Sequence, residues 1–141
     1  MRAIDTNVLV RLLARDDAAQ TRTAEAYVAK GAWVPLLALA ETVWVLDAVY
    51  RRSAEQIAVA VDMLLSHEQL VLERGDVVLA ALEQYQAKPR TGFSDCLMLE
   101  IARAAGHLPL GTFDKPLARR NGAQLLGCSS SGTTLCNVRV A

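Results

Sequence analysis

The sequence has little of what several common protein classes depend on. Its 141 residues include three cysteines with no CxxC pair and two histidines, His67 and His107, outside any zinc-like spacing. We therefore expect neither a thiol-ligated zinc site nor a disulfide framework. The N-terminus shows no signal-peptide pattern and no apolar run is long enough to span a bilayer, so we expect a cytoplasmic chain without membrane contact.

Excess positive charge and aromatic side chains are also lacking. The formal net charge is zero, which excludes a positive field over the whole molecule as the means of attracting nucleic acid. Aromatic residues make up 5% of the chain, which argues against extensive base stacking. Any nucleic acid would be held by local basic patches and recognised by shape or as a structured loop.

What the chain does have is enough apolar sequence for one compact core. The chain is 52% hydrophobic, and its 141 residues are too few for two ordinary domains. We therefore predict one domain over residues 1–126. The first half of residues 127–141 is rich in Ser, Thr and Gly, and the segment lacks helical periodicity and carries Cys128 and Cys136. We interpret them as an appended tail and a candidate for disorder.

Short apolar segments alternate with helical patterns along this domain. Strands are expected at residues 3–4, 32–34, 70–72, 109–112 and 124–126. Helices are expected from a cap at Thr6 or Asn7 to 13, and at 17–30, 36–50, 53–65, 76–88 and 94–105, with a short one after Asp114. The alternation predicts an α/β fold with a parallel sheet covered on both faces, and the helices at 36–50 and 53–65 would form a hairpin.

Asp5 and Asp114 each follow an expected strand and precede a helix. Either can be a simple helix cap, and Pro116 after Asp114 is typical of a first helical turn. Ligand sites of open parallel sheets also lie just past the carboxyl ends of strands. The sequence therefore leaves two interpretations open for each of these acids, a helix cap or a residue of a ligand site.

Glu41 is less easily explained as a structural residue. It lies on an apolar helical stripe between Leu37, four residues before, and Trp44 and Val45, three and four residues after. Burying an unpaired ion costs several kcal/mol. The alternatives are a distant basic partner or a tilt toward water, and we favour a functional role.

Asp95 follows Ser94 at the start of a helix, where the helix dipole favours a negative charge. The rest of that turn, residues 96–99, is apolar on every side, so we expect a deeply buried helix whose acid faces a cleft. By contrast, Glu100 has Arg103 three residues later and is expected to form an ordinary surface pair.

The predicted fold gathers four acids at one edge of the sheet: Asp5, Glu41, Asp95 and Asp114. Carboxylates held close together need a cation between them, and Mg²⁺ and Mn²⁺ prefer oxygen ligands. Such a cluster can activate water for phosphodiester hydrolysis. Asn7, Ser94 and Thr112 lie beside three of the acids, either to orient ligands or as caps and turns.

Four segments together resemble the PIN domain family, specifically VapC-type toxins: AIDTNVLV at 3–10, LAETVWVL at 39–46, FSDCL at 93–97 and GTFDKPL at 111–117. The resemblance runs from about Arg2 to Leu126 with the motifs in order. It implies a Rossmann-like three-layer α/β/α sandwich with a short-stranded central parallel sheet and a protruding helical hairpin. It also implies Mg²⁺- or Mn²⁺-dependent endonucleolytic cleavage of RNA by the toxin of a bacterial type II toxin–antitoxin pair.

The resemblance also assigns residues and partners. Asp5, Glu41, Asp95 and Asp114 match the family's catalytic and metal-binding acids, Asp114 being the one that can act through water, while Asn7 and Thr112 match its supporting positions. Members are typically homodimers, silenced by an antitoxin that often approaches the acids with a basic side chain. The helical hairpin with Trp33, Trp44 and Tyr50 nearby is a candidate antitoxin groove, or core.

Basic residues flank several of these motifs, and they can contact phosphates on either side of a scissile bond or keep helix ends in water. They are Arg11, Arg15, Arg51, Arg52, Lys88, Arg90, Arg119 and Arg120. Two rival functions remain at this point. One is a haloacid-dehalogenase-like hydrolase with Asp5 as nucleophile, for which the chain is short and Glu41 has no role. The other is a PIN-like interaction module without turnover, although all four acids are present.

Overall fold

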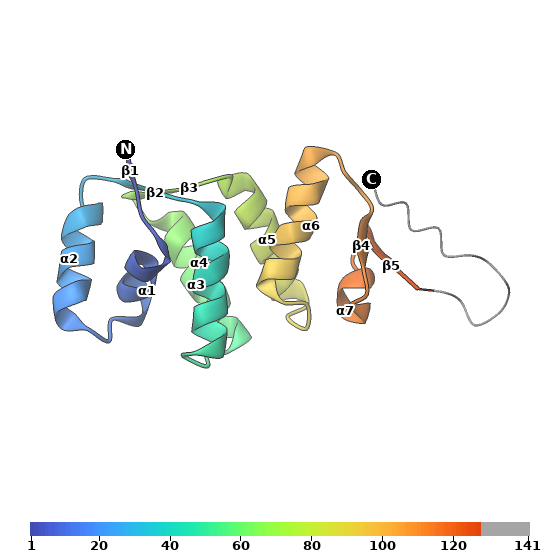
Figure 1. The fold of residues 1–141 in the computed structure, drawn as a ribbon, viewed down its shortest axis with the longest axis horizontal. Helices are drawn as coiled ribbons and strands as arrows, with labels where there is room; N and C mark the ends of the chain where they lie inside the picture. Colours follow the sequence, from blue (N-terminus) through green and yellow to red (C-terminus); the bar gives the residue numbers. More distant parts are fainter. Residues whose placement is uncertain (128–141) are drawn as a thin grey trace, which may run out of the picture.

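The computed structural model describes residues 1–127, and within them short strands alternate with helices in the predicted order (Figure 1). The strands are β1 (Arg2–Ala3), β2 (Ala32–Val34), β3 (Leu70–Leu72), β4 (Leu110–Thr112) and β5 (Ala123–Leu125). The helices are α1 (Thr6–Ala14), α2 (Ala18–Val28), α3 (Leu36–Ala48), α4 (Ala54–Ser66), α5 (Gly75–Ala87), α6 (Phe93–Ala105) and α7 (Lys115–Ala118). The mixed α/β class is therefore confirmed, while the predicted tail, residues 127–141, lies outside the described residues except for Gly127.

The strands pair in parallel, as predicted, but they form two sheets rather than one central sheet. One sheet has the order β1-β2-β3, with Ala3 opposite Trp33 and Trp33 opposite Val71. The other contains β4 and β5 alone, with Leu110 opposite Ala123. Figure 1 shows the β4–β5 sheet toward one end of the long axis, with α5 and α6 between it and the β1-β2-β3 sheet. Consequently β1 and β4 each border their own sheet instead of pairing with each other.

Hydrogen bonds to the end of α5 hold the second sheet where it is. We call β4, α7 and β5 together the C-terminal unit (residues 110–125). The Arg120 guanidinium in this unit donates to the Thr91 hydroxyl (3.2 Å) and to the carbonyls of Gln84 (2.9 Å) and Lys88. Arg103 of α6 donates to the Asn121 carbonyl at 2.6 Å. These bonds fix the C-terminal unit against α5 and α6. The order of strands along the sequence alone does not predict this position.

Helix ends follow local sequence signals, with one correction. Ser53 and Gln56 form the predicted capping box of α4, and Gly106 ends α6 with a positive φ of 79°. The cap of α1, however, is Asp5 rather than Thr6 or Asn7, because the Asp5 carboxylate accepts the Val8 N–H at 3.1 Å. Thr6 is thereby the first helical residue.

The helices α3 and α4 pack into the common core. Leu39 and Val43 of α3 and Ile57 and Val61 of α4 are all buried in the same hydrophobic cluster. The principal neighbour of α3 is α1, and that of α4 is α5, so each helix contacts these more than it contacts the other. The two helices also contact each other, as expected of the predicted hairpin, and their apolar faces are buried in the core.

Candidate functional site

Asp5 and Glu41 are brought to neighbouring positions through Thr6. Asp5 lies just past β1 and caps α1, and the Thr6 hydroxyl that follows it donates to Glu41 Oε2 at 2.6 Å. Packing of α1 against α3 makes this contact possible across 35 residues of sequence. Both carboxylates are exposed. We refer to them as the Asp5–Glu41 pair.

The stripe that carries Glu41 faces solvent. The expectation that Glu41 is a buried, unpaired charge is therefore wrong. Leu37 is 71% exposed, Trp44 is 64% exposed and Glu41 is itself exposed. The buried face of α3 carries Leu39, Thr42 and Val43 instead. Since α3 is apolar on nearly all sides, the sequence pattern cannot tell which face turns inward. The hydrogen bond from Thr6, and not a desolvation cost, is what now distinguishes Glu41.

Asp95 and Asp114 form a second pair. Asp95 lies half-buried in the first turn of α6, and Asp114 is exposed directly before α7. Burial, and then the nearby charge of Asp114, raise the pKa of Asp95 above its ordinary value. The Asp114 N–H donates to the Thr112 hydroxyl at 3.0 Å, a local turn that fixes the backbone there. We refer to these acids as the Asp95–Asp114 pair.

The surroundings of Asp95 agree in part with the sequence expectation. Cys96, Leu97 and Leu99 are buried, whereas Met98 faces solvent, so α6 is less deeply buried than predicted. Asp95 does face a cleft, of about 370 Å³. Its lining includes Trp44, Asp47, Arg90, Ser94 and Asp95. The cleft thus offers a flat aromatic surface, a guanidinium and two carboxylates to one ligand.

The four acids do not all converge. Within residues 1–127, no three Asp, Glu, His or Cys side chains lie close enough together to hold one metal ion. The reason is topological: β4, which carries Asp114 past its end, belongs to a different sheet from β1, which carries Asp5 past its end. The described structure therefore presents two separate carboxylate pairs.

Comparison with protein-family models shows which family this chain belongs to. The sequence model of the PIN domain matches residues 3–123. The chain belongs to the PIN domain family. PIN domains are generally nucleases, so the fold is of a nuclease type and the dehalogenase-like alternative is set aside. Searches of curated proteins and of solved structures gave no match.

The three supporting residues predicted from the sequence lie in different surroundings. Asn7 is exposed and, with Asp5, lines a cavity of about 600 Å³ between α1 and α2. Ser94 is half-buried beside Asp95, and Thr112 accepts the turn hydrogen bond described above. Thr6 was missed at the sequence level. It stands between two predicted site residues, but its partner is remote in sequence, so no spacing rule could have indicated the contact.

Glu100 has a structural role that the sequence expectation missed. The expected pairing with Arg103 is present, with Arg103 Nε donating to Glu100 at 3.3 Å. The pair is not an ordinary surface pair, however, because Glu100 is only 7% exposed and also accepts a hydrogen bond from the Gln84 amide. Glu100 thus ties α6 to α5, a contact that local helix spacing does not reveal.

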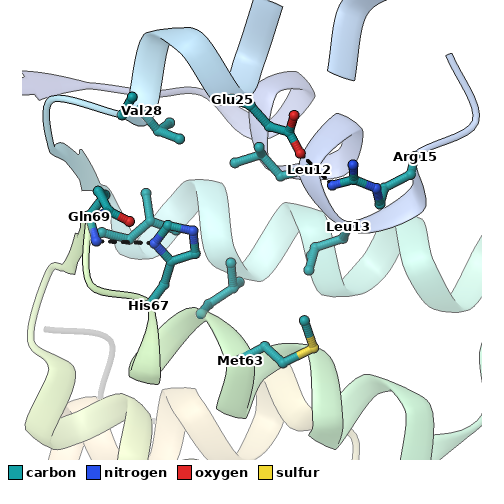
Figure 2. A pocket seen from close by; sticks show the side chains of 11 residues that line it. Leu12, Leu13, Arg15, Glu25, Val28, Met63, His67 and Gln69 are labelled. Atoms are coloured by element: carbon teal, nitrogen blue, oxygen red, sulfur yellow. Dashed lines mark hydrogen bonds and ion pairs between the residues drawn. The ribbon is translucent and has the colours of Figure 1, made fainter. Parts of the chain in front are cut away.

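A further cavity of this PIN domain, of about 470 Å³, lies away from the four acids, among α1, α2, α4 and the start of β3. Figure 2 shows that its polar groups are paired with each other: Arg15 with Glu25 at 2.6 Å, and the Gln69 N–H with His67 Nδ1 at 3.1 Å. The remaining lining is mainly apolar, including Leu12, Leu13 and Met63. No described helix is long and apolar enough to cross a membrane.

Proposed function

We propose that this PIN domain is a Mg²⁺- or Mn²⁺-dependent endoribonuclease that uses Asp5, Glu41, Asp95 and Asp114. The observation that carries the proposal is the Asp95–Asp114 pair, in which one carboxylate is half-buried and faces a second negative charge. A divalent cation is the ligand that relieves such repulsion. Family membership supports nuclease chemistry, and the four motifs supply an acid each.

The donor set suits a hard metal ion. All four groups are carboxylates, and no sulfur or imidazole ligand is needed, which fits Mg²⁺ and Mn²⁺ better than zinc. Asp95 and Asp114 would hold the ion, while Asp5 and Glu41 offer oxygen ligands as the separate pair described above. When bound, the ion supplies an activated water and neutralises charge on the leaving oxygen.

The protein groups around the acids fit an RNA substrate. Arg90 in the cleft beside Asp95 can contact a phosphate, and the exposed ring of Trp44 can stack on one base. Thr6 orients Glu41, and Ser94 and Asn7 offer hydrogen bonds next to Asp95 and Asp5. With so few aromatic residues, we expect recognition of a structured loop rather than a long single strand.

The test is the chemistry of the RNA ends. If the purified chain cleaves RNA with a metal-activated water, the new ends carry a phosphate monoester and a hydroxyl, and EDTA abolishes the reaction. Products ending in a 2′,3′-cyclic phosphate would instead show attack by the ribose hydroxyl and overturn this mechanism. RNA binding without any cleavage would favour the alternative of an inactive interaction module.

We further propose that the chain is a VapC-type toxin of the cytoplasm, held silent by an antitoxin, on the strength of the motif resemblance. An antitoxin segment that presents a basic side chain would substitute for metal charge at the acids. The experiment is to sequence RNA ends after inducing the chain with and without the product of its upstream genomic neighbour. A defined cleavage site that the neighbour suppresses is the expected result; cleavage that it leaves unchanged would contradict the pairing.

A further inference from the structure

The cleft beside Asp95 holds two opposite charges that no described residue neutralises. Asp47 of α3 and Arg90, between α5 and α6, both line this cleft of about 370 Å³, and both are exposed. None of the ion pairs among residues 1–127 involves either side chain. Each charge is therefore available to a ligand, and the volume of the cleft suits one small group, since pockets for small ligands span roughly 300–1,000 Å³.

Trp44 lies between the candidate active site and Asp47. On the surface of α3 it neighbours both Glu41 and Asp47, because it is three residues from each, and all three side chains are exposed. Asp47 lies about 9 Å farther along the helix axis than Glu41, at about 1.5 Å per residue. A nucleotide whose phosphate lies at the candidate active site would therefore have its base at Trp44 and the edge of that base at Asp47.

The Asp47 carboxylate distinguishes among the four RNA bases. An ionised carboxylate only accepts hydrogen bonds, through two oxygens. Guanine is the one RNA base whose Watson–Crick edge carries two adjacent donors, the N1–H and the 2-amino group. Adenine, cytosine and uracil each place an acceptor beside their donor, and this acceptor would repel the second carboxylate oxygen. The carboxylate therefore fits guanine with two hydrogen bonds.

The charge of Asp47 reaches across the cleft. After burial, this charge raises the pKa of the Tyr85 phenol, which belongs to α5 and lines the same cleft. Such a charge repels a phosphate, so Asp47 suits a base and not the RNA backbone. Arg90, five residues before Asp95, offers the positive charge that a phosphate requires.

We propose that this cleft binds an unpaired guanine base next to the phosphate that is cleaved. Trp44 stacks on the base, Asp47 accepts hydrogen bonds from its N1–H and 2-amino group, and Arg90 contacts the phosphate. The Watson–Crick edge of guanine is occupied in a duplex, so the guanine recognised is one in a loop or a single strand. The inference rests on the proposed function in taking RNA as the ligand.

Nucleoside 5′-monophosphates test the site without a bond to cleave. Tryptophan fluorescence is followed in Mg²⁺ buffer while GMP, AMP or IMP is added, IMP being GMP without the 2-amino group. GMP is expected to bind about tenfold more tightly than IMP, which loses one hydrogen bond to a charged group, and also more tightly than AMP. The quenching should disappear in Trp44→Leu, which retains Trp33. Equal affinities for the three nucleotides in the wild type, or no binding, would overturn the proposal.

Asp47→Asn is expected to change the preferred base. Asparagine presents one acceptor and one donor, which fit adenine and not the two donors of guanine. The variant should bind GMP about tenfold more weakly than the wild type and should prefer AMP to GMP. Asp62→Asn, an exposed acid of α4 that does not line the cleft, is the matched control and should keep the wild-type order. A preference for GMP that persists in folded Asp47→Asn would overturn the role of Asp47.

Sequencing of cleaved RNA ends separates this inference from the proposed function. Cuts by the wild type should lie beside unpaired guanines, and cuts by Asp47→Asn should shift toward adenines. Cleavage without a preference for any base would overturn the guanine site and leave the nuclease proposal intact. Preferential binding of GMP without any cleavage of RNA would support the guanine site and count against the nuclease proposal.

Discussion

At the scale of single residues, the most specific contact in the site is the hydrogen bond from the Thr6 hydroxyl to Glu41. We expect Thr6→Val to lower kcat/KM for RNA by about tenfold, because a lost hydrogen bond to a charged group costs roughly 1.5–3 kcal/mol and this one is solvent-exposed. Thr6→Ser keeps the hydroxyl and should retain most of the activity. Equal losses in both variants would contradict this assignment, because restoring the hydroxyl in Thr6→Ser would then restore no activity.

The acids themselves can be tested without RNA. Because Mg²⁺ or Mn²⁺ would bind the folded chain, either ion should raise the melting temperature of the wild type. The rise should be smaller in Asp5→Asn and in Asp95→Asn, which lose charge but almost no volume. Asp62→Asn, an exposed acid of α4, is the matched control and should respond like the wild type. Equal rises in all four proteins would show that the site acids bind no metal.

The four acids were predicted from their positions at strand ends and on helices. The same reasoning also led to the one wrong expectation, that Glu41 is buried. Strand ends indicated Asp5 and Asp114, and the first turn of α6 indicated Asp95. Glu41 was singled out because its stripe is apolar, yet Leu37 and Trp44 on that stripe face solvent. The Thr6 contact depends on how α1 packs against α3, which no local pattern encodes.

At the scale of elements, the ends of α1 and α3 are joined by Asp16. The hydrogen bond from the Tyr50 hydroxyl, at 2.8 Å, and then the Arg11 guanidinium lower the pKa of Asp16 below its ordinary value. A carboxyl with a lowered folded-state pKa adds stability at neutral pH, and this stability is lost as the pH falls through that pKa, below about 4.

Tyr50→Phe should therefore melt at a slightly lower temperature than the wild type at pH 7. The difference should shrink as the pH falls below about 4, where Asp16 is protonated in both proteins. Thermal unfolding at a series of pH values measures this directly. A difference that stays constant down to the lowest pH would mean that the hydroxyl stabilises the fold independently of the Asp16 charge.

Arg120 fixes the place of the C-terminal unit. Arg120→Met should lower the free energy of unfolding by about 2 kcal/mol, because it leaves the carbonyls of Gln84 and Lys88 without their charged donor. Chemical denaturation gives the value, and limited proteolysis should show earlier cleavage between α6 and β4. The neighbouring exposed Arg119 provides the control, Arg119→Met, and an equal loss there would contradict the assigned role.

Most element positions were predictable from sequence because they depend on local chemistry. The capping box at Ser53 and the glycine at 106 mark helix ends, and short apolar runs between helices mark strands. The division into two sheets was not predictable. It follows from Arg120, whose partners lie 29 to 36 residues earlier in the chain.

At the scale of the whole molecule, two carboxylate pairs lie on a PIN domain whose two sheets stand apart. The nuclease account requires these acids to bind a cation, and the half-buried Asp95 beside the charge of Asp114 is the pair that most needs one.

The central claim is most directly tested by the rate at which the purified chain cleaves end-labelled RNA with Mg²⁺ or Mn²⁺. The account predicts that Asp95→Asn lowers this rate on the order of a hundredfold or more without unfolding the protein, because the half-buried carboxylate is lost from the metal site. Asp62→Asn should cleave like the wild type. A full rate in folded Asp95→Asn, or wild-type cleavage that continues in EDTA, would contradict it.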